Sequence, residues 1–212
     1  MFVPTPRAPE SEERYPDSLA RLGGWLFKRR TVIPLPVAAA LLLISPSWFP
    51  SSLSTSMALV GVPVVALGEL LRVWGVHHIG VISRTRSERL GPLIASGPFS
   101  LVRNPLYLGN ILLWLGFAVS ARLLWLAPFV VALLALEYHA IVRWEERLLE
   151  SRLGQPYRDY MDRVPRWLPL LRSPERLDAA AASSWRATLY SERGTLIAIA
   201  VGYLLLWAKS KA

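Results

Sequence analysis

Two long stretches almost free of charge constrain this chain more than any other feature. Between residues 31 and 71 the only charged side chain is Glu69, and between residues 104 and 136 it is Arg122. A bilayer core needs about 20 apolar residues per helix, and 53% of the chain is apolar. The sequence therefore predicts an integral membrane protein. The same composition argues against a water-soluble globule and a disordered chain, and the absence of cysteine argues against a disulfide scaffold.

The apolar pattern predicts an all-α, polytopic helical bundle. About five membrane helices are expected, over residues 32–49, 57–79, 105–121, 123–142 and 194–208. The last span rises only about 22 Å, so it must recruit the turn before Gly194, thin the bilayer or lie shallowly. Gly61, Gly68 and Gly75 recur every seven residues on the second span. They are expected to share a face where another helix approaches closely.

Basic residues near the span ends set the expected orientation. Lys28, Arg29 and Arg30 precede the first span, and further arginines follow the second (Arg84, Arg86, Arg89 and Arg103). Positive residues favour the cytoplasm, which places the N-terminus, the segment 80–104 and the polar region after residue 142 on that side. Three parts are expected: a flexible tail over 1–30, a membrane core over 31–172, and an extension over 173–212 with one further short membrane helix.

The net charge of +9 raises the question of nucleic acid, which the charge distribution answers. Residues 143–178 contain eight arginines and seven acidic residues, so they form a nearly neutral mixture and no basic stripe. Apolar residues recur at helical spacing within this region, with interruptions expected at Gly154 and Pro156. The region is therefore predicted to be an amphipathic helical segment at the membrane surface, and nucleic acid is not an expected partner.

The first segment that could bind a ligand is the start of the third span. Asn104 is a good N-cap residue, and Pro105 is favoured at the first position of a helix. Such a start presents free N–H groups and a positive dipole end, which suit a carboxylate or phosphate, and Arg103 adds a full charge. An ordinary helix start beside a snorkelling arginine explains the local pattern equally.

The second segment is Glu145-Glu146, just beyond the fourth span. Adjacent carboxylates on a helix diverge by about 100°, so one is expected to face inward and the other solvent. A solvated pair balanced by Arg143 and Arg147 is the ordinary alternative. Ionisable residues inside spans are further candidates, although Glu69 and Arg72 could simply pair with each other. The three histidines have no metal-ligand spacing, so no metal site is expected.

Taken in order, these motifs resemble the isoprenylcysteine carboxyl methyltransferase and phospholipid methyltransferase superfamily. The resemblance runs from about residue 67 to 169. It rests on Gly97-Pro98-Phe99, Arg103-Asn104-Pro105-Leu106-Tyr107-Leu108-Gly109, Glu145-Glu146-Arg147-Leu148-Leu149, Leu153-Gly154, Tyr157, Tyr160 and Arg163-Val164-Pro165. It implies an integral membrane enzyme that uses S-adenosylmethionine in a cytoplasmic pocket.

The resemblance also implies the site residues. Cofactor contacts carried over by position are Leu93, Ile94, Phe99, Asn104, Pro105, Leu106, Tyr107 and Glu145. The helix start would hold the carboxylate of the cofactor, and a glutamate would accept from its ammonium or ribose hydroxyls. The isoprenylcysteine enzymes that this chain resembles have an arginine four residues before the glutamate, where it contacts the substrate carboxylate. This chain has Ile141 at that position. The resemblance therefore supports the cofactor more strongly than it supports a prenylated cysteine substrate.

The sequence therefore predicts methyl transfer from S-adenosylmethionine to a lipid-like or amphipathic acceptor that enters from the bilayer. Arg103 and Arg143 are the candidates for binding an anionic part of the acceptor, and no general base is assigned. One alternative is an NADPH-dependent membrane reductase with a related bundle, for which Arg84, Arg86 and Arg89 could bind phosphates. Another is a non-enzymatic small transporter or assembly protein. The expected partners are membrane lipids and the lipophilic or amphipathic acceptor.

Overall fold

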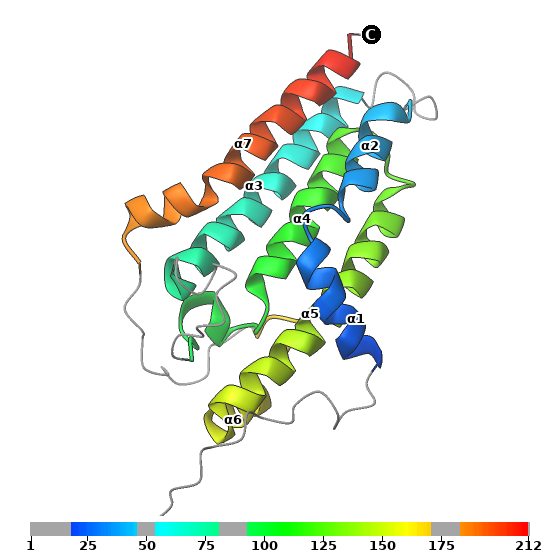
Figure 1. The fold of residues 1–212 in the computed structure, drawn as a ribbon. Helices are drawn as coiled ribbons and strands as arrows, with labels where there is room; N and C mark the ends of the chain where they lie inside the picture. Colours follow the sequence, from blue (N-terminus) through cyan, green and yellow to red (C-terminus); the bar gives the residue numbers. More distant parts are fainter. Residues whose placement is uncertain (1–17, 46–53, 81–92, 171–182, 212) are drawn as a thin grey trace, which may run out of the picture.

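The chain folds into a bundle of helices. A computed structural model describes residues 18–45, 54–80, 93–170 and 183–211, and all regular structure within these ranges is helical (Figure 1). The elements are α1 (Ser18–Arg29), α2 (Leu35–Leu43), α3 (Ser54–Ile79), the 3-10 helix η3 (Gly97–Ser100), α4 (Pro105–Ser120), α5 (Ala127–Leu153), α6 (Gln155–Arg163) and α7 (Trp185–Lys209). The predicted all-α fold is confirmed.

Three helices are long and apolar enough to cross a membrane. They are Leu59–Ile79 within α3, then α5 and α7, and the shorter apolar helix α4 lies among them. Helix α4 packs against both α3 and α5, and α7 packs against α3 (Figure 1). Helix α6 lies at one end of this bundle, called here the α6 end, and the C-terminus lies at the other. An integral membrane protein is the architecture that these helices support.

Glycines bring α3 and α4 into close contact, as the seven-residue spacing predicts. Gly61, Gly68 and Gly75 all face α4, and Gly68 lies opposite Gly109. An ideal Cβ on Gly68 would lie 2.8 Å from the Gly109 carbonyl oxygen and 2.9 Å from the Leu113 nitrogen. Because there is no room for a methyl group between these backbones, the face that was expected to receive another helix is confirmed.

The N-terminal region differs from the sequence expectation. Residues 18–29, expected within a flexible tail, form α1, and the expected span over 32–49 begins as the nine-residue helix α2. The small residues Ala20 and Gly23 are buried where α1 packs on α5. Pro34 and Pro36 interrupt the helical path between α1 and α2, because proline supplies no N–H donor. The apolar content of residues 32–49 predicted one continuous span and did not reveal the interruption between α1 and α2.

Helix α5 is longer and starts later than expected. It runs from Ala127 through both glutamates to Leu153, and residues 121–126 form the connection from α4. Arg122 in this connection adopts a positive φ of 62°. The interruption expected near Gly154 is confirmed, since Gly154 ends α5 with a φ of 62° and α6 follows. The continuous α5 carries Glu145 and Glu146 on a rigid rod instead of a separate surface segment.

Helix α7 recruits residues before Gly194, as its short apolar stretch requires. It begins at Trp185, and the Ser184 Oγ caps it by accepting from the Ala187 N–H at 3.3 Å. Near its middle, Glu192 is fully buried and pairs with Arg72 of α3 at 2.8 Å, while Thr195 accepts from the same guanidinium at 3.1 Å. The extension therefore docks on the core through polar side chains inside the bundle.

Further polar contacts fix α7 along its length. His77 of α3 stacks on Trp185 with ring centroids 3.9 Å apart. Ser120 of α4 hydrogen-bonds the Tyr203 hydroxyl at 3.2 Å. At the far end Lys209 donates to the carbonyl oxygens of Leu41 and Ile44, at 2.7 and 2.6 Å, where α2 ends. Lipid tails offer no hydrophobic driving force between helices, so these contacts supply specificity for the docking of α7.

Substitution of Gly68 tests the close approach of α3 and α4. Gly68→Ala should lower the free energy of unfolding by about 1–3 kcal/mol, because the added methyl overpacks against backbone atoms. Gly194→Ala is the matched control, since its Cβ would meet nothing within 4 Å. It should stabilise by about 0.5–1 kcal/mol through helix propensity. The measurement is thermal unfolding of both variants in the same detergent. Equal unfolding midpoints for Gly68→Ala and Gly194→Ala would contradict the close α3–α4 packing.

Substitution of Glu192 tests the docking of α7. Glu192→Ala should destabilise the protein by about 3–5 kcal/mol, because it leaves Arg72 buried with less compensating charge. Arg193→Ala, at the exposed neighbouring position, should stay within about 0.5 kcal/mol of the parent. The measurement is the unfolding midpoint followed by tryptophan fluorescence. A Glu192→Ala protein as stable as the Arg193→Ala control would show that the pair does not hold the helix.

Candidate functional site

The motif residues meet at the α6 end of the bundle. The start of α4, the last turns of α5, α6 and the segment 164–170 come together there, and the segment 164–170 runs beneath the start of α4. The Arg103 N–H donates to the Pro165 carbonyl at 2.9 Å, and the Leu170 N–H donates to the Leu101 carbonyl at 3.0 Å. We call residues 164–170 the strap, because they tie the end of α6 to the entry of α4.

Helix α4 begins at Pro105 as predicted, but Asn104 does not cap it with its side chain. The Asn104 Nδ2 donates instead to the Arg166 carbonyl of the strap at 3.2 Å. The expected cap is therefore wrong, because the strap offers the amide a carbonyl acceptor that local sequence could not reveal. Asn104 joins the two segments on either side of the site.

Glu146 is the central carboxylate of the site. It is 7% exposed, accepts hydrogen bonds from Arg166 and forms an ion pair with Arg103. Arg166 binds it through Nε, at 3.1 and 3.0 Å, and through Nη2 at 2.6 Å, while Arg103 Nη1 lies 3.1 Å from Oε1. The hydrogen bonds that Arg166 donates to Glu146 raise the pKa of the Arg166 guanidinium above its ordinary value. This fork fixes α5, the strap and the residue before α4 in one arrangement.

Glu145 points to a different set of partners. The Tyr107 hydroxyl of α4 hydrogen-bonds its carboxylate, and the positive charge of Arg30 acts on both groups. Tyr107 also packs against Tyr138, with ring centroids 4.9 Å apart. The two glutamates diverge as expected for adjacent residues on a helix, but neither is left in solvent. The expectation of one solvated partner is wrong because α1 and the strap cover opposite sides of α5.

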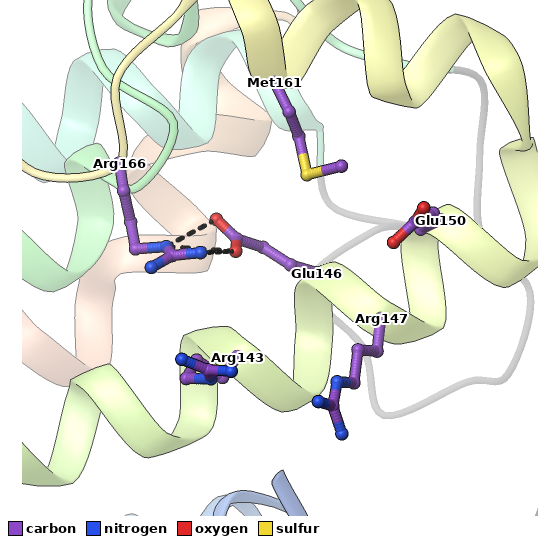
Figure 2. Close-up of a pocket in the computed structure, with 6 residues that line it drawn as sticks. All are labelled: Arg143, Glu146, Arg147, Glu150, Met161 and Arg166. Atoms are coloured by element: carbon purple, nitrogen blue, oxygen red, sulfur yellow. Dashed lines mark hydrogen bonds and ion pairs between the residues drawn. The ribbon is translucent and has the colours of Figure 1, made fainter. Parts of the chain in front are cut away.

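A cavity of about 260 Å³ opens beside Glu146 (Figure 2). It is lined by Arg143, Glu146, Arg147, Glu150, Met161 and Arg166. Its walls come from α5, α6 and the strap, and the Arg166–Glu146 fork forms one side (Figure 2). Three cationic and two anionic side chains give it a net positive lining. Arg143, predicted to bind an acceptor, lies on this wall, whereas Arg103 faces Glu146.

The predicted cofactor contacts before α4 lie against α6. Phe99 is buried, and its carbonyl accepts from the Tyr160 hydroxyl at 2.7 Å. Leu93 packs on the apolar cluster of Ala95, Tyr157, Tyr160 and Val164, and Ile94 is half-buried beside it. Burial raises the pKa of Tyr157 and Tyr160 above that of a free tyrosine, which keeps both hydroxyls protonated as donors. Helix α6 therefore anchors the loop that leads into α4.

The structure thus brings together Asn104, Tyr107 and the glutamate pair, with Leu93 and Phe99 on the α6 side. Pro105 and Leu106 begin α4 at the same place, and Leu106 packs near Gly75. Arg84, Arg86 and Arg89 lie outside the described residues. Across the described part of the chain, no three possible metal-ligating side chains come together.

Sequence reasoning missed the roles of Arg30 and Arg166. Arg166 stands next to the Val164-Pro165 motif, so its position in that motif was an available signal. Arg30 lies more than a hundred residues from Glu145 along the chain, and only the packing of α1 on α5 brings them near. No local pattern signalled this proximity.

This chain is similar to a known protein family and to two curated proteins. Residues 56–156 match the family described as phospholipid methyltransferase. The cobalt-zinc-cadmium resistance protein CzcN of Cupriavidus metallidurans is 30% identical over 71% of this chain and 64% of its own length. The nickel-cobalt-cadmium resistance protein NccN of Alcaligenes xylosoxydans xylosoxydans is 30% identical over 71% of this chain and 65% of its own length.

This chain therefore spans slightly less than two thirds of the curated relatives that it matches. No solved structure matches it significantly. The family match includes α3, the α4–α5 hairpin, both glutamates and the start of α6, which are the elements that build the site. Over residues 56–156, slightly less than half of its length, this chain is similar to the phospholipid methyltransferase family.

Proposed function

We propose that this protein transfers a methyl group from S-adenosylmethionine to a lipid-like or amphipathic acceptor at the cytoplasmic face of a membrane. The observation that carries the proposal is the meeting of the α4 start with the Glu145–Glu146 pair beside a charged cavity. The match of residues 56–156 to the phospholipid methyltransferase family supports the reaction class. The basic residues at the α6 end support a cytoplasmic orientation by the positive-inside tendency.

The residues at this end fit the charges of the cofactor. S-adenosylmethionine supplies an electrophilic methyl on a sulfonium, together with an ammonium and a carboxylate. Glu145 would accept from the ammonium or the ribose hydroxyls, and the first turn of α4 would hold the carboxylate. Leu93, Ile94 and Phe99 would supply apolar contacts, and Asn104 through Tyr107 would shape the remaining wall. The donor set on α4 and α5 therefore suits a small molecule with both charges.

Cofactor binding requires some movement. A cavity of about 260 Å³ is slightly smaller than the roughly 300–1,000 Å³ of ordinary small-molecule sites. Arg166 is the element that we infer to move, because its side chain is 31% exposed at the edge of the cavity while Glu146 is only 8% exposed. Swinging Arg166 outward would enlarge the cavity toward the start of α4. Closure behind the cofactor would then exclude water from the methyl transfer.

The acceptor side of the site rests on arginine. Arg143 lines the cavity and would bind an anionic part of the acceptor, while Arg103 would contribute after rearrangement of its bond to Glu146. Alignment of acceptor and methyl donor would supply most of the acceleration, because an in-line displacement depends on orientation. CzcN and NccN are named for metal resistance. If this chain had a similar role in metal resistance, the methylated product would be what provides the resistance.

Cofactor binding provides the first test. Titration calorimetry of the full chain in detergent should detect S-adenosylmethionine binding, and Glu145→Gln should weaken it about tenfold or more, through loss of a charge-assisted hydrogen bond. Asp162→Asn is the control, because Asp162 is an exposed carboxylate on α6. It should bind within about twofold of the parent. Absence of heat with the parent protein, or equal affinity in both variants, would count against the proposal.

Transfer to lipid provides the second test. Membranes containing the protein, given cofactor labelled at the transferable methyl, should accumulate label in the lipid extract. The Glu145→Gln membranes should accumulate at least about tenfold less, since the cofactor would be poorly held. Label that stays with the cofactor, combined with thermal stabilisation by NADPH, would favour the reductase. Stabilisation by neither nucleotide would favour a non-enzymatic membrane protein.

A further inference from the structure

The bend between α1 and α2 carries three consecutive positive charges. Residues 18–45 contain no aspartate or glutamate, and Lys28, Arg29 and Arg30 follow one another at the end of α1. Among the described residues these three form no ion pair with a carboxylate, and only Glu145 lies near enough for Arg30 to act on it electrostatically. We call residues 25–35 the elbow. Its charge is therefore available to a ligand from outside the protein.

Aromatic rings hold the two arginines of the elbow in place. The Arg29 guanidinium lies 4.3 Å from the centre of the Trp25 ring, and that of Arg30 lies 3.9 Å from the centre of the Phe27 ring. Phe27 in turn packs on Trp144 of α5, with centroids 4.9 Å apart. A cation–π contact restrains a guanidinium but leaves its N–H donors unused at the edge. Such edges match the oxygens of a phosphate.

The surroundings of the elbow are apolar and exposed. Leu22, Trp25, Val32 and Leu35 are each about half exposed or more, although they belong to a membrane bundle. Figure 1 places α1 and α2 along the side of the bundle, with α1 beside α5, and the helix contacts agree. Arg30 lies near enough to Glu145 to act on it electrostatically, so the elbow is at the level of the site. Phosphate-binding groups thus adjoin a surface suited to acyl chains.

We propose that the elbow binds an anionic phospholipid, with its phosphate on Arg29 and Arg30 and its acyl chains along the apolar side chains of α1 and α2. The chemistry commits to a lipid because the cationic groups and the exposed apolar groups are contiguous. Free phosphate would contact only the cationic groups. This site is separate from the cavity beside Glu146 and does not depend on methyl transfer.

Competition binding tests the proposal directly. The full chain in a neutral detergent is loaded with a fluorescent short-chain phosphatidylglycerol, which is then displaced by unlabelled phosphatidylglycerol, phosphatidylcholine or inorganic phosphate. Phosphatidylglycerol should displace the probe at a concentration at least about tenfold lower than phosphatidylcholine, and inorganic phosphate should fail. The double variant Arg29→Gln/Arg30→Gln should bind phosphatidylglycerol about 10- to 30-fold more weakly, because two surface charges are lost.

Arg193→Gln is the matched control. Arg193 is an exposed arginine whose guanidinium lies 3.6 Å from the centre of the Tyr190 ring, but on α7. It should bind the lipid within about twofold of the parent, whereas a loss equal to that of the double variant would reduce the effect to general surface charge and overturn the site. Unchanged binding by the double variant, equal displacement by the two lipids, or displacement by phosphate would also overturn it.

Two further variants guard against misfolding of the double variant. Arg29→Gln and Arg30→Gln, made singly, should each weaken binding about fivefold. Arg29→Lys/Arg30→Lys keeps the charge but loses the planar fork, so its affinity should lie between that of the parent and that of the double glutamine variant. Single variants that elute as the parent does and bind with the parent's affinity would overturn the proposal.

Discussion

The candidate site depends on one buried carboxylate with two arginines. Glu146 connects α5 to the strap through Arg166 and to the entry of α4 through Arg103. Removing a buried carboxylate from such a fork would leave two positive charges facing each other at low dielectric, a change that costs about 3–5 kcal/mol for a single broken pair. The geometry of Asn104, Tyr107 and the cavity wall follows from this arrangement. Glu146 is therefore best understood as a positioning residue, which leaves Glu145 for a ligand.

Specific contacts between helices also hold the interior of the bundle together. Helices in lipid gain little from apolar contact, so close backbone approach and polar pairs decide which faces meet. The α3–α4 interface uses the first device, with Gly68 opposite Gly109, and the α3–α7 interface uses the second, with Arg72 on Glu192. Arg72 also donates to Asn110 of α4, so a single guanidinium links three helices. The extension α7 completes a polar cluster that begins in the core.

Sequence patterns predicted the parts of this structure that depend on local chemistry. Low charge and apolar length predicted the long membrane helices α3, α5 and α7, the glycine spacing predicted the α3–α4 contact, and Gly154 and Pro156 marked the break before α6. The elements that the sequence did not predict depend on distant partners. Asn104 donates to the Arg166 carbonyl of the strap, 62 residues away. Helix α1 packs on α5 through Gly23, and this contact is visible only in the folded structure. A single sequence carries no signal for such pairings, because the residues involved are ordinary in their own neighbourhoods.

The two adjacent glutamates point in directions about 100° apart, so each faces a different side of the site. Glu146 faces the strap and the cavity at the α6 end, where Arg143 would bind an anionic part of the acceptor. Glu145 faces Tyr107 and the side of the bundle where α1 and α2 bend, next to exposed apolar side chains. Under the proposed function, a cofactor held by Glu145 and an acceptor held by Arg143 would have to meet within about one turn of α5. The rigid passage of α5 from the bilayer to Leu153 provides such a turn, because adjacent residues on it point about 100° apart.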